Sequence, residues 1–455
     1  MRKTALFTAT AALAVLAGCG DQDPVSSQTA EPAAKLTVSG ERAGGSAERR
    51  PVSGPVSFRV TIENIGQAYA FSGSGVFNTP SGATGPGPLL QGSSYDFSFH
   101  AGPGAKLSFA TMYVQSNDLF FAPDEDGIAL FDADGAPISG DVTDQVQLWD
   151  AGTEANQEPG VGSDQAPRQS GPNTGAPESG FVRVVDDGFD YGAVADLIQV
   201  NVSSEPSDGA FLFTVSIANI SATTPLAPGV WAVGGGSAAL FDEGLADRGD
   251  GLEAIAEDGN PAGLAEVLAS QTGVTTVLAP GIWTVHTEDD PLFTAGEADR
   301  GEGLEGIAED GNPGDLAAAL DGTNSGVFNT PVGAEGPGPL PPGGSYEFTL
   351  VAEPGDWLSF ATMFVQSNDL FYAPDGRGIP LFSGRFTRGG NVTHLVDLWD
   401  AGTEVNQIPG MGADQAPRQA GPDTGEDENG VVDLVADGFS YPSVRSSIRV
   451  TVRAE

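Results

Sequence analysis

Two short acidic loops contain the residue types and spacing best suited to binding a metal ion. Each reads Asp-Ala-Gly-Thr-Glu, at residues 150–154 and again at residues 400–404. Two carboxylates stand four positions apart in each loop, and the intervening glycine permits the tight turn that would direct both toward one ion. Calcium takes about six to eight oxygen ligands, mostly from carboxylates, carbonyls and water. The loops therefore suggest a calcium site that a third carboxylate, from the end of a neighbouring strand, would complete.

Other metal-binding and catalytic patterns are weaker. Asp132-Ala133-Asp134-Gly135 resembles the start of an EF-hand loop, but Thr143 stands where that loop needs its final glutamate. The histidines, His100, His286 and His394, share no metal-ligand spacing, which argues against zinc. Neither a Gly-x-Ser-x-Gly nucleophile motif nor a lysine-containing phosphate loop is found. A carboxylate pair could still serve glycoside hydrolysis, so an enzyme acting on envelope glycans is an alternative hypothesis.

The N-terminus has the features of an export signal followed by a lipid attachment site. Arg2 and Lys3 precede an apolar run, and Leu-Ala-Gly-Cys then ends at Cys19, the only cysteine of the chain. The order of basic, apolar and small residues is typical of a signal peptide, and the run is too short for a transmembrane helix. Leu-Ala-Gly-Cys matches the lipobox of bacterial lipoproteins. We therefore expect a signal peptide over residues 1–18, a lipid on Cys19 and no intrachain disulfide.

Composition indicates where the protein works. Residues 19–54 are rich in Ser, Ala, Glu, Pro and Gly without an apolar period, which predicts a flexible tether. The chain has 62 acidic against 19 basic residues and a formal net charge of -43. Such a surface repels nucleic acid and anionic lipid headgroups, so the lipid alone would hold the protein at a membrane. Because Gly20 and not Asp follows Cys19, Gram-negative sorting favours the outer membrane or cell surface.

Two long sequence blocks occur twice in the same order. Residues 107–120 return at 358–371 with 13 of 14 residues identical, and residues 148–175 return at 398–425 with 22 of 28 identical. Repetition of several blocks in one order indicates duplication of a whole domain.

The two copies differ at their starts. Eight residues separate Ile65, the end of the segment FRVTIENI, from the block SGVFNTP, whereas 104 residues separate Ile220, the end of FTVSIANI, from the second copy of that block. The longer stretch is itself duplicated and has helical spacing in its second half. We therefore expect domain 1 over residues 55–203 without a helical insert. Domain 2 is expected over residues 210–455, with a duplicated short-helix insert at about 225–322.

Short strands are expected in both copies. The chain has 64 Gly and 33 Pro, which supply turns for many strands. Tyr346, Phe348 and Leu350 alternate with polar residues, and residues 358–365 are apolar on both faces, as in a central strand. The sequence thus predicts a mainly β fold with two antiparallel β-sandwich domains.

The blocks FRVTIEN, SGVFNTP, LSFATMFVQSNDLF and LWDAGTE together resemble the bacterial spondin-domain proteins. These are similar to the N-terminal spondin domain of F-spondin and mindin. The resemblance covers about residues 56–202 and 211–453. It implies β-sandwiches related in shape to C2 domains, with helices in one connection and one calcium site, in a family whose animal members are extracellular and adhesive.

The resemblance also implies which residues hold calcium. The family's Pro-Asp-Trp segment matches Asn-Asp-Leu at residues 117–119 and 368–370. Its Asp-Ala-Gly-Thr-Asp loop matches the two acidic loops, with Glu in place of the last Asp. The implied ligands are Asp118, Asp150 and Glu154 in copy 1, and Asp369, Asp400 and Glu404 in copy 2.

These features together predict a non-enzymatic, calcium-binding and lipid-anchored envelope module. Its expected role is adhesion, with a surface protein or glycan as ligand. A purely structural spacer is a further alternative, because the sequence does not separate it from an adhesive module.

Overall fold

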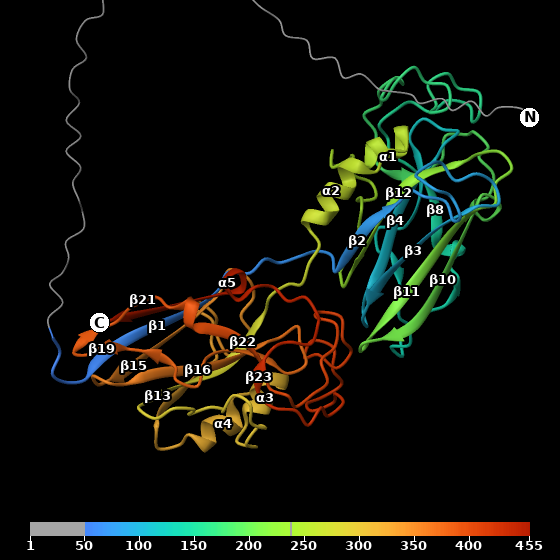
Figure 1. Ribbon diagram of the computed structural model, residues 1–455. Coiled ribbons are helices and arrows are strands. Elements are labelled where there is room, and N and C mark those ends of the chain that lie inside the picture. The colour runs from blue at the N-terminus through green and yellow to red at the C-terminus, as the bar shows by residue number, and fades with distance from the viewer. Residues whose placement is uncertain (1–50, 237–238) are drawn as a thin grey trace, which may run out of the picture. The chain divides into compact units, whose positions relative to one another are not determined.

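The structure is a computed structural model that describes residues 51–236 and 239–455. The expected signal peptide, Cys19 and most of the expected tether lie outside the described residues. Antiparallel strands dominate the described chain and form two β-sandwiches, which we call sandwich 1 and sandwich 2 (Figure 1). The predicted mainly β sandwich fold is confirmed.

Sandwich 1 lies between residues 73 and 270. Its smaller sheet has the order β3, β11, β10, β7, and its larger sheet the order β2, β12, β4, β5, β8, β9, with β6 beside β4. Its strands are β2 (Gly73–Phe77), β3 (Ser94–Ala101), β4 (Lys106–Tyr113), β5 (Leu119–Pro123), β6 (Ile128–Ala129), β7 (Gly140–Asp141), β8 (Val146–Asp150), β9 (Arg183–Val184), β10 (Ile198–Ser207), β11 (Ala210–Asn219) and β12 (Leu226–Gly234). Its helices are α1 (Leu252–Asp258) and α2 (Ala262–Ser270), with 3-10 turns η1 (Thr143–Gln145) and η2 (Val194–Asp196).

Sandwich 2 has the same plan. Its smaller sheet has the order β15, β1, β24, β21, and its larger sheet the order β14, β13, β16, β17, β22, β23, with β18 beside β16. Its strands are β1 (Val56–Asn64), β13 (Leu278–His286), β14 (Asn324–Phe328), β15 (Ser345–Ala352), β16 (Trp357–Phe364), β17 (Leu370–Pro374), β18 (Ile379–Pro380), β21 (Gly390–Asn391), β22 (Val396–Asp400), β23 (Asp433–Leu434) and β24 (Ile448–Ala454), with a small hairpin of β19 (Phe382–Ser383) and β20 (Phe386–Thr387). Its helices are α3 (Leu304–Asp310), α4 (Gly314–Ala319) and α5 (Val444–Ser447), with the 3-10 turn η3 (Thr393–Leu395).

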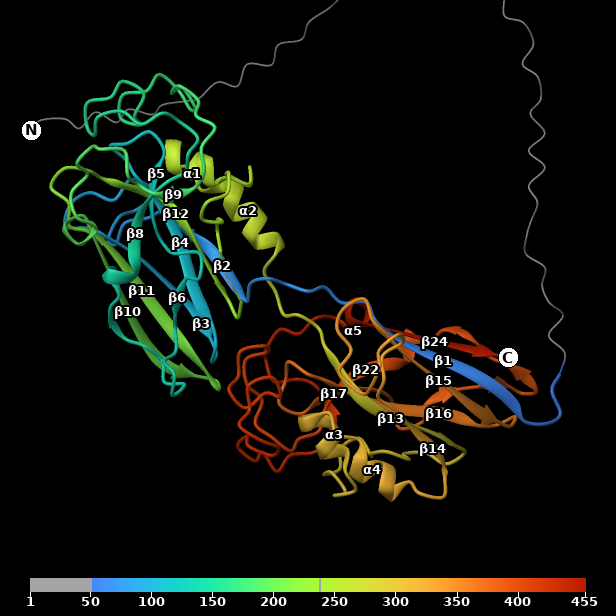
Figure 2. The same cartoon turned by 180° about the vertical axis from the view of Figure 1, so that it is seen from behind.

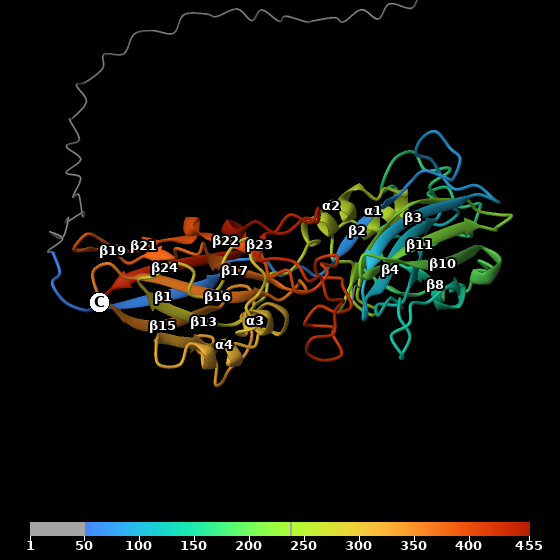
Figure 3. The same cartoon turned by 60° about the horizontal axis from the view of Figure 1, so that its bottom comes forward.

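Each larger sheet is covered on both faces. In sandwich 1, Phe109 of β4 shares a buried cluster with Phe213 of the smaller sheet. On the opposite face, Ala110 of β4 shares a second cluster with Ile255 of α1 and Leu264 of α2. Helices α3 and α4 cover the corresponding face of sandwich 2 (Figure 3). This arrangement explains why β4 and β16 are apolar at both alternating sets of positions.

The strands are not divided between the two sandwiches at the domain boundaries that the repeats suggested. Strand β1 lies between β15 and β24 of sandwich 2, and Figure 2 shows its blue ribbon among the orange and red strands. The corresponding place in sandwich 1, between β3 and β10, is filled by β11. Residues 55–203 are therefore not one domain. Sandwich 2 combines residues 56–64 with 278–454, and sandwich 1 keeps residues 210–219.

A tight turn explains this exchange of strands. Asp208 and Gly209 join β10 to β11, both with positive φ (46° and 74°), and Ser207 pairs with Ala210. A two-residue Asp-Gly turn of this kind strongly favours a hairpin. Because the hairpin places β11 beside β10, the place in sandwich 1 that β1 would occupy is already filled. Strand β1 has an equivalent pattern and pairs in sandwich 2.

The duplicated insert is shared between the sandwiches. Strand β12 with α1 and α2 completes sandwich 1, and β13 with α3 and α4 completes sandwich 2. The prediction that the first copy lacks the insert is therefore wrong, because one half of the insert belongs to sandwich 1. Two segments, residues 65–72 and 271–277, connect the sandwiches, and they run in parallel: the Phe71 N–H donates to the Gln271 carbonyl (3.1 Å) and the Gly273 N–H to the Phe71 carbonyl (3.0 Å).

Candidate metal centre

The predicted ligands lie where neighbouring strands of each larger sheet meet the acidic loop. In sandwich 2, Asp369 directly precedes β17 and Asp400 ends β22, and Leu370 stands opposite Asp400 in the ladder. The Ala401 N–H donates to the Asp369 carbonyl (3.2 Å). In sandwich 1, β5 and β8 bring Asp118 and Asp150 together by the same pairing. Antiparallel pairing thus places two carboxylates side by side in each sandwich.

Asp369 is fully buried, and only one of its carboxylate oxygens has hydrogen-bond partners. Its Oδ2 accepts from the N–H groups of Thr403 (2.8 Å) and Glu404 (3.1 Å) and from the Thr403 hydroxyl (3.2 Å). Its Oδ1 has no partner, and the same is true of Asp118 in sandwich 1. A buried carboxylate oxygen without a donor is unfavourable unless a proton or a cation fills that place.

A third carboxylate joins the pair in sandwich 2. Oxygens of Asp369, Asp400 and Glu428 lie within 4.8 Å of one another, and we call this group the Asp369 cluster. The loop after β22 carries Glu428, whose N–H donates to the Thr403 carbonyl (2.9 Å). Within the described part of the chain, no salt bridge involves any of these acids. Three carboxylates without a positive partner are suited to a cation that prefers oxygen ligands.

Glu404 and Glu154, which the resemblance also implied as ligands, make a different set of contacts. Oε1 of Glu404 accepts from the Gly425 N–H (2.8 Å), and Oε2 from the Asn368 amide (3.2 Å). Glu154 accepts from the Gly175 N–H (2.6 Å) in the same way. These glutamates tie each acidic loop to the segment that follows it, and Glu428 takes the third place in the cluster.

In sandwich 1 a guanidinium group meets the corresponding carboxylates. Arg183 Nη2 lies 2.7 Å from Asp150 Oδ2 and 3.3 Å from Glu178 Oε1. These two acids correspond to Asp400 and Glu428. Arg183 stands opposite Asp150 in the β8–β9 pair, whereas Asp433 stands opposite Asp400 in the β22–β23 pair. Sandwich 1 therefore supplies its own positive charge at this place, and sandwich 2 adds a further negative one.

Burial and mutual repulsion change the protonation of these groups. Desolvation, with the nearby charge of Asp150, raises the pKa of Asp118 to about 7. The pKa of Asp369 is raised by desolvation and by Asp400. Desolvation also raises the pKa of Asp150, but there the charge of Arg183 opposes the rise. A cation bound beside Asp369 would lower its pKa in the way that Arg183 acts on Asp150.

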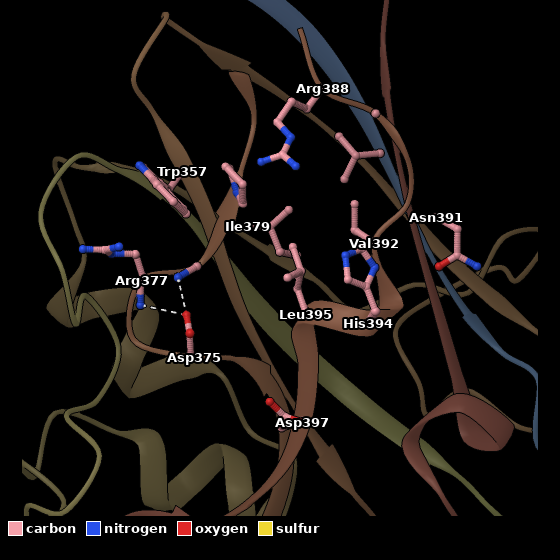
Figure 4. Close-up of a pocket in the computed structure, with 14 residues that line it drawn as sticks. Trp357, Asp375, Arg377, Ile379, Arg388, Asn391, Val392, His394, Leu395 and Asp397 are labelled. Carbon is pink, nitrogen blue, oxygen red and sulfur yellow. Dashed lines mark hydrogen bonds between the residues drawn. The ribbon is translucent and has the colours of Figure 1, made fainter. Parts of the chain in front are cut away.

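A pocket of about 450 Å³ in sandwich 2 is separate from the Asp369 cluster. Trp357, Arg388 and Asp375 are among the residues that line it (Figure 4). Asp375 Oδ1 accepts from the backbone N–H groups of Arg377 (3.1 Å) and Gly378 (3.2 Å), so this carboxylate shapes a turn. No member of the Asp369 cluster lines the pocket.

Comparison with known proteins leaves the family open. The chain matches no protein-family model, and no curated protein matches it in sequence. The spondin resemblance therefore stays a prediction based on the sequence blocks. In the described part of the chain, none of the helices has the length and apolar character needed to cross a membrane.

Sequence reasoning missed Glu428 as a member of the cluster, and it missed the contrast between Arg183 and Asp433. The second repeat block ends at residues 175 and 425, before all three positions, so the comparison of identical blocks does not include them. Extending its offset of 250 residues places Glu178 on Glu428 and Arg183 on Asp433. The opposite charges of Arg183 and Asp433, at one position of two otherwise similar copies, are the sequence feature from which this contrast could have been predicted.

Proposed function

We propose that this chain is a lipid-anchored envelope module of the spondin type, and that its sandwich 2 binds calcium through the Asp369 cluster. The observation that supports this most is the meeting of three carboxylates, one with a buried oxygen that has no partner. Calcium would accept these oxygens, with carbonyls and water completing its shell. Its charge would offset the repulsion between the acids. Because the unfolded chain lacks the site, binding would stabilise the fold.

Sandwich 1 is not proposed to hold an ion at Asp118, Asp150 and Glu154. The guanidinium of Arg183 already contacts Asp150 and Glu178, and a divalent cation would have to displace it. The proposal therefore narrows the prediction of one site in each copy to one site in sandwich 2.

A calcium titration of the chelated protein tests this proposal. Millimolar calcium is expected to raise the melting temperature by roughly 5 °C or more, since an ion at 100 times its Kd adds about 2.7 kcal/mol. The Asp400→Asn variant is expected to lose this response. Asp150→Asn, the matched change in sandwich 1, is expected to keep it. An unchanged melting temperature in the wild-type chain, or an equal response in Asp400→Asn, would overturn the proposal.

Calcium affinity at this site is expected to depend on pH. Protons compete with the ion for Asp369, whose pKa is raised by desolvation and by Asp400. Affinity should therefore weaken as the pH falls below that raised pKa, by up to about tenfold for each pH unit. Repeating the titration between pH 5.5 and pH 7.5, as a rough working range, measures this dependence.

The envelope location rests on Cys19, which lies outside the described residues. We propose that its lipid anchors the protein in the outer membrane or at the cell surface, where a surface protein or a glycan would be the ligand. The Cys19→Ser variant is expected to move from the membrane fraction to the soluble fraction. Retention of that variant in the membrane fraction would contradict the anchor.

We favour binding over catalysis for the predicted acids. An enzyme acting on glycans would need a carboxylate pair that faces a cleft. Asp369 and Asp400 do not line the pocket beside Trp357, and Asp369 is fully buried. These observations support a binding module, and a structural spacer would differ from it only in having no ligand besides the ion.

A further inference from the structure

A second group of carboxylates lies beside α3 in sandwich 2. Oxygens of Glu305, Glu309 and Asp423 lie within 4.8 Å of one another, and we call this group the Glu309 cluster. Glu305 and Glu309 stand four positions apart on α3, so they share one side of the helix. Asp423 comes from the loop after β22. That loop is held to the helix by Gln419, whose amide donates to Asp310 Oδ1 (2.7 Å).

Glu309 is the buried member of this group. Its exposed fraction is 2%, and its Oε1 has no hydrogen-bond partner. Glu305 is half-buried and Asp423 is exposed, so the group reaches from the interior to the surface. Desolvation raises the pKa of Glu309 to about 8, and the neighbouring acids Glu404, Glu305 and Asp369 contribute to the rise. A buried carboxylate that has an oxygen without a partner and lies beside two further carboxylates is an arrangement in which a cation removes an unfavourable interaction.

Sandwich 1 has a different arrangement at the same place. Glu253 and Glu257 correspond to the two helix glutamates, but Asn173 stands where sandwich 2 has Asp423. The Asn173 amide donates to Glu253 Oε1 (2.9 Å). Glu257 is also buried without partners, so a buried glutamate is common to both sandwiches. The third carboxylate is the feature that only sandwich 2 has.

We propose that Glu305, Glu309 and Asp423 form a second calcium site, present in sandwich 2 only. All three are hard oxygen ligands, and the group contains no histidine or cysteine, which favours calcium over zinc. The open side at Asp423 leaves room for water ligands. The ligands come from α3 and a loop, whereas those of the Asp369 cluster come from strand ends and a different part of that loop. The two groups share no residue, so a substitution can remove the ligands of one and leave those of the other in place.

The test counts calcium ions bound to the full mature chain, by equilibrium dialysis at millimolar calcium in about 0.15 M salt to screen diffuse binding. We expect two ions for the wild-type chain. Each removing variant imports the residue that sandwich 1 already has at that place, so the fold should tolerate it. Asp423→Asn removes the Glu309 site, Asp433→Arg removes the Asp369 site, and each is expected to bind one ion. The double variant should bind none.

The outcomes separate this site from the one proposed above. If the wild-type chain binds one ion and Asp433→Arg abolishes it, the Glu309 cluster is not a site and the earlier proposal stands. If it binds one ion and Asp423→Asn abolishes it, the earlier proposal fails and this one stands. If the Asp423→Asn variant binds as many calcium ions as the wild-type chain, the inference is overturned. The reverse change, Asn173→Asp, is expected to add one ion in sandwich 1.

Discussion

The Val60→Asp substitution is expected to unfold sandwich 2 and to leave sandwich 1 folded. Val60 lies fully buried in β1, opposite Phe348 of β15 and Val452 of β24. A carboxylate placed between the two sheets would cost several kcal/mol, a large part of the stability of a domain. If residues 55–203 formed one domain, the damage would fall on sandwich 1 instead. The substitution therefore tests the exchange of strands between the sandwiches.

The matched variant is Val215→Asp, because Val215 has the corresponding place in β11, opposite Phe97 of β3. It is expected to unfold sandwich 1 and to spare sandwich 2. Hydrogen exchange read by mass spectrometry separates the two results, since peptides from residues 73–270 and 278–454 report on different sandwiches. Loss of protection in β3 and β10 of the Val60→Asp variant, with β15 and β24 protected, would refute the strand assignment.

Arg183→Ala is expected to destabilise sandwich 1 in the absence of calcium by about 2 kcal/mol. The change leaves Asp150 fully buried without the guanidinium that lies 2.7 Å away. Removing one partner of a buried ion pair costs about 3–5 kcal/mol, and the value is smaller here because Arg183 is partly exposed. The melting temperature of sandwich 1 should fall by several degrees.

Calcium is expected to restore part of this loss. Once Arg183 is removed, sandwich 1 keeps Asp118, Asp150 and Glu178, the carboxylates that correspond in sequence to the Asp369 cluster, and no longer has the positive charge beside Asp150. The control is Asp433→Ala, which removes a negative charge opposite Asp400 and should not destabilise the chelated chain. If Arg183→Ala has the melting temperature of the wild type, or if calcium does not raise the melting temperature of this variant, the arginine does not take the place of an ion.

The fold could be predicted from local patterns, but the repeated blocks alone do not assign the strands to the two sandwiches. Alternation at Tyr346, Phe348 and Leu350 indicates a strand wherever its partner lies. Strands β1 and β11 have interchangeable patterns, so the choice between two equivalent places depends on neighbours distant in sequence. The Asp208–Gly209 turn decides that choice, because it fixes β11 beside β10. This turn is visible in the sequence and was the missing evidence.

The candidate site was predictable in part for a related reason. Asp369 and Asp400 flank strands whose pairing follows from the repeated blocks, so their approach could be expected. Glu428 reaches them from a long irregular loop, and Arg183 lies in a two-residue strand after the equivalent loop. Neither loop has a periodic pattern that fixes where its side chains lie. Only the residue-by-residue comparison of the two copies gives a hint of their role.

The central claim is that calcium binds beside Asp369 in sandwich 2 and not beside Asp118 in sandwich 1. Hydrogen exchange of the wild-type chain with and without calcium tests it most directly, because the amides of Thr403 and Glu404 bond to Asp369 and those of Thr153 and Glu154 bond to Asp118. We predict that calcium slows exchange in peptides covering residues 368–404 and leaves residues 117–154 unchanged. Equal slowing in both segments, or no change in either, would contradict the account.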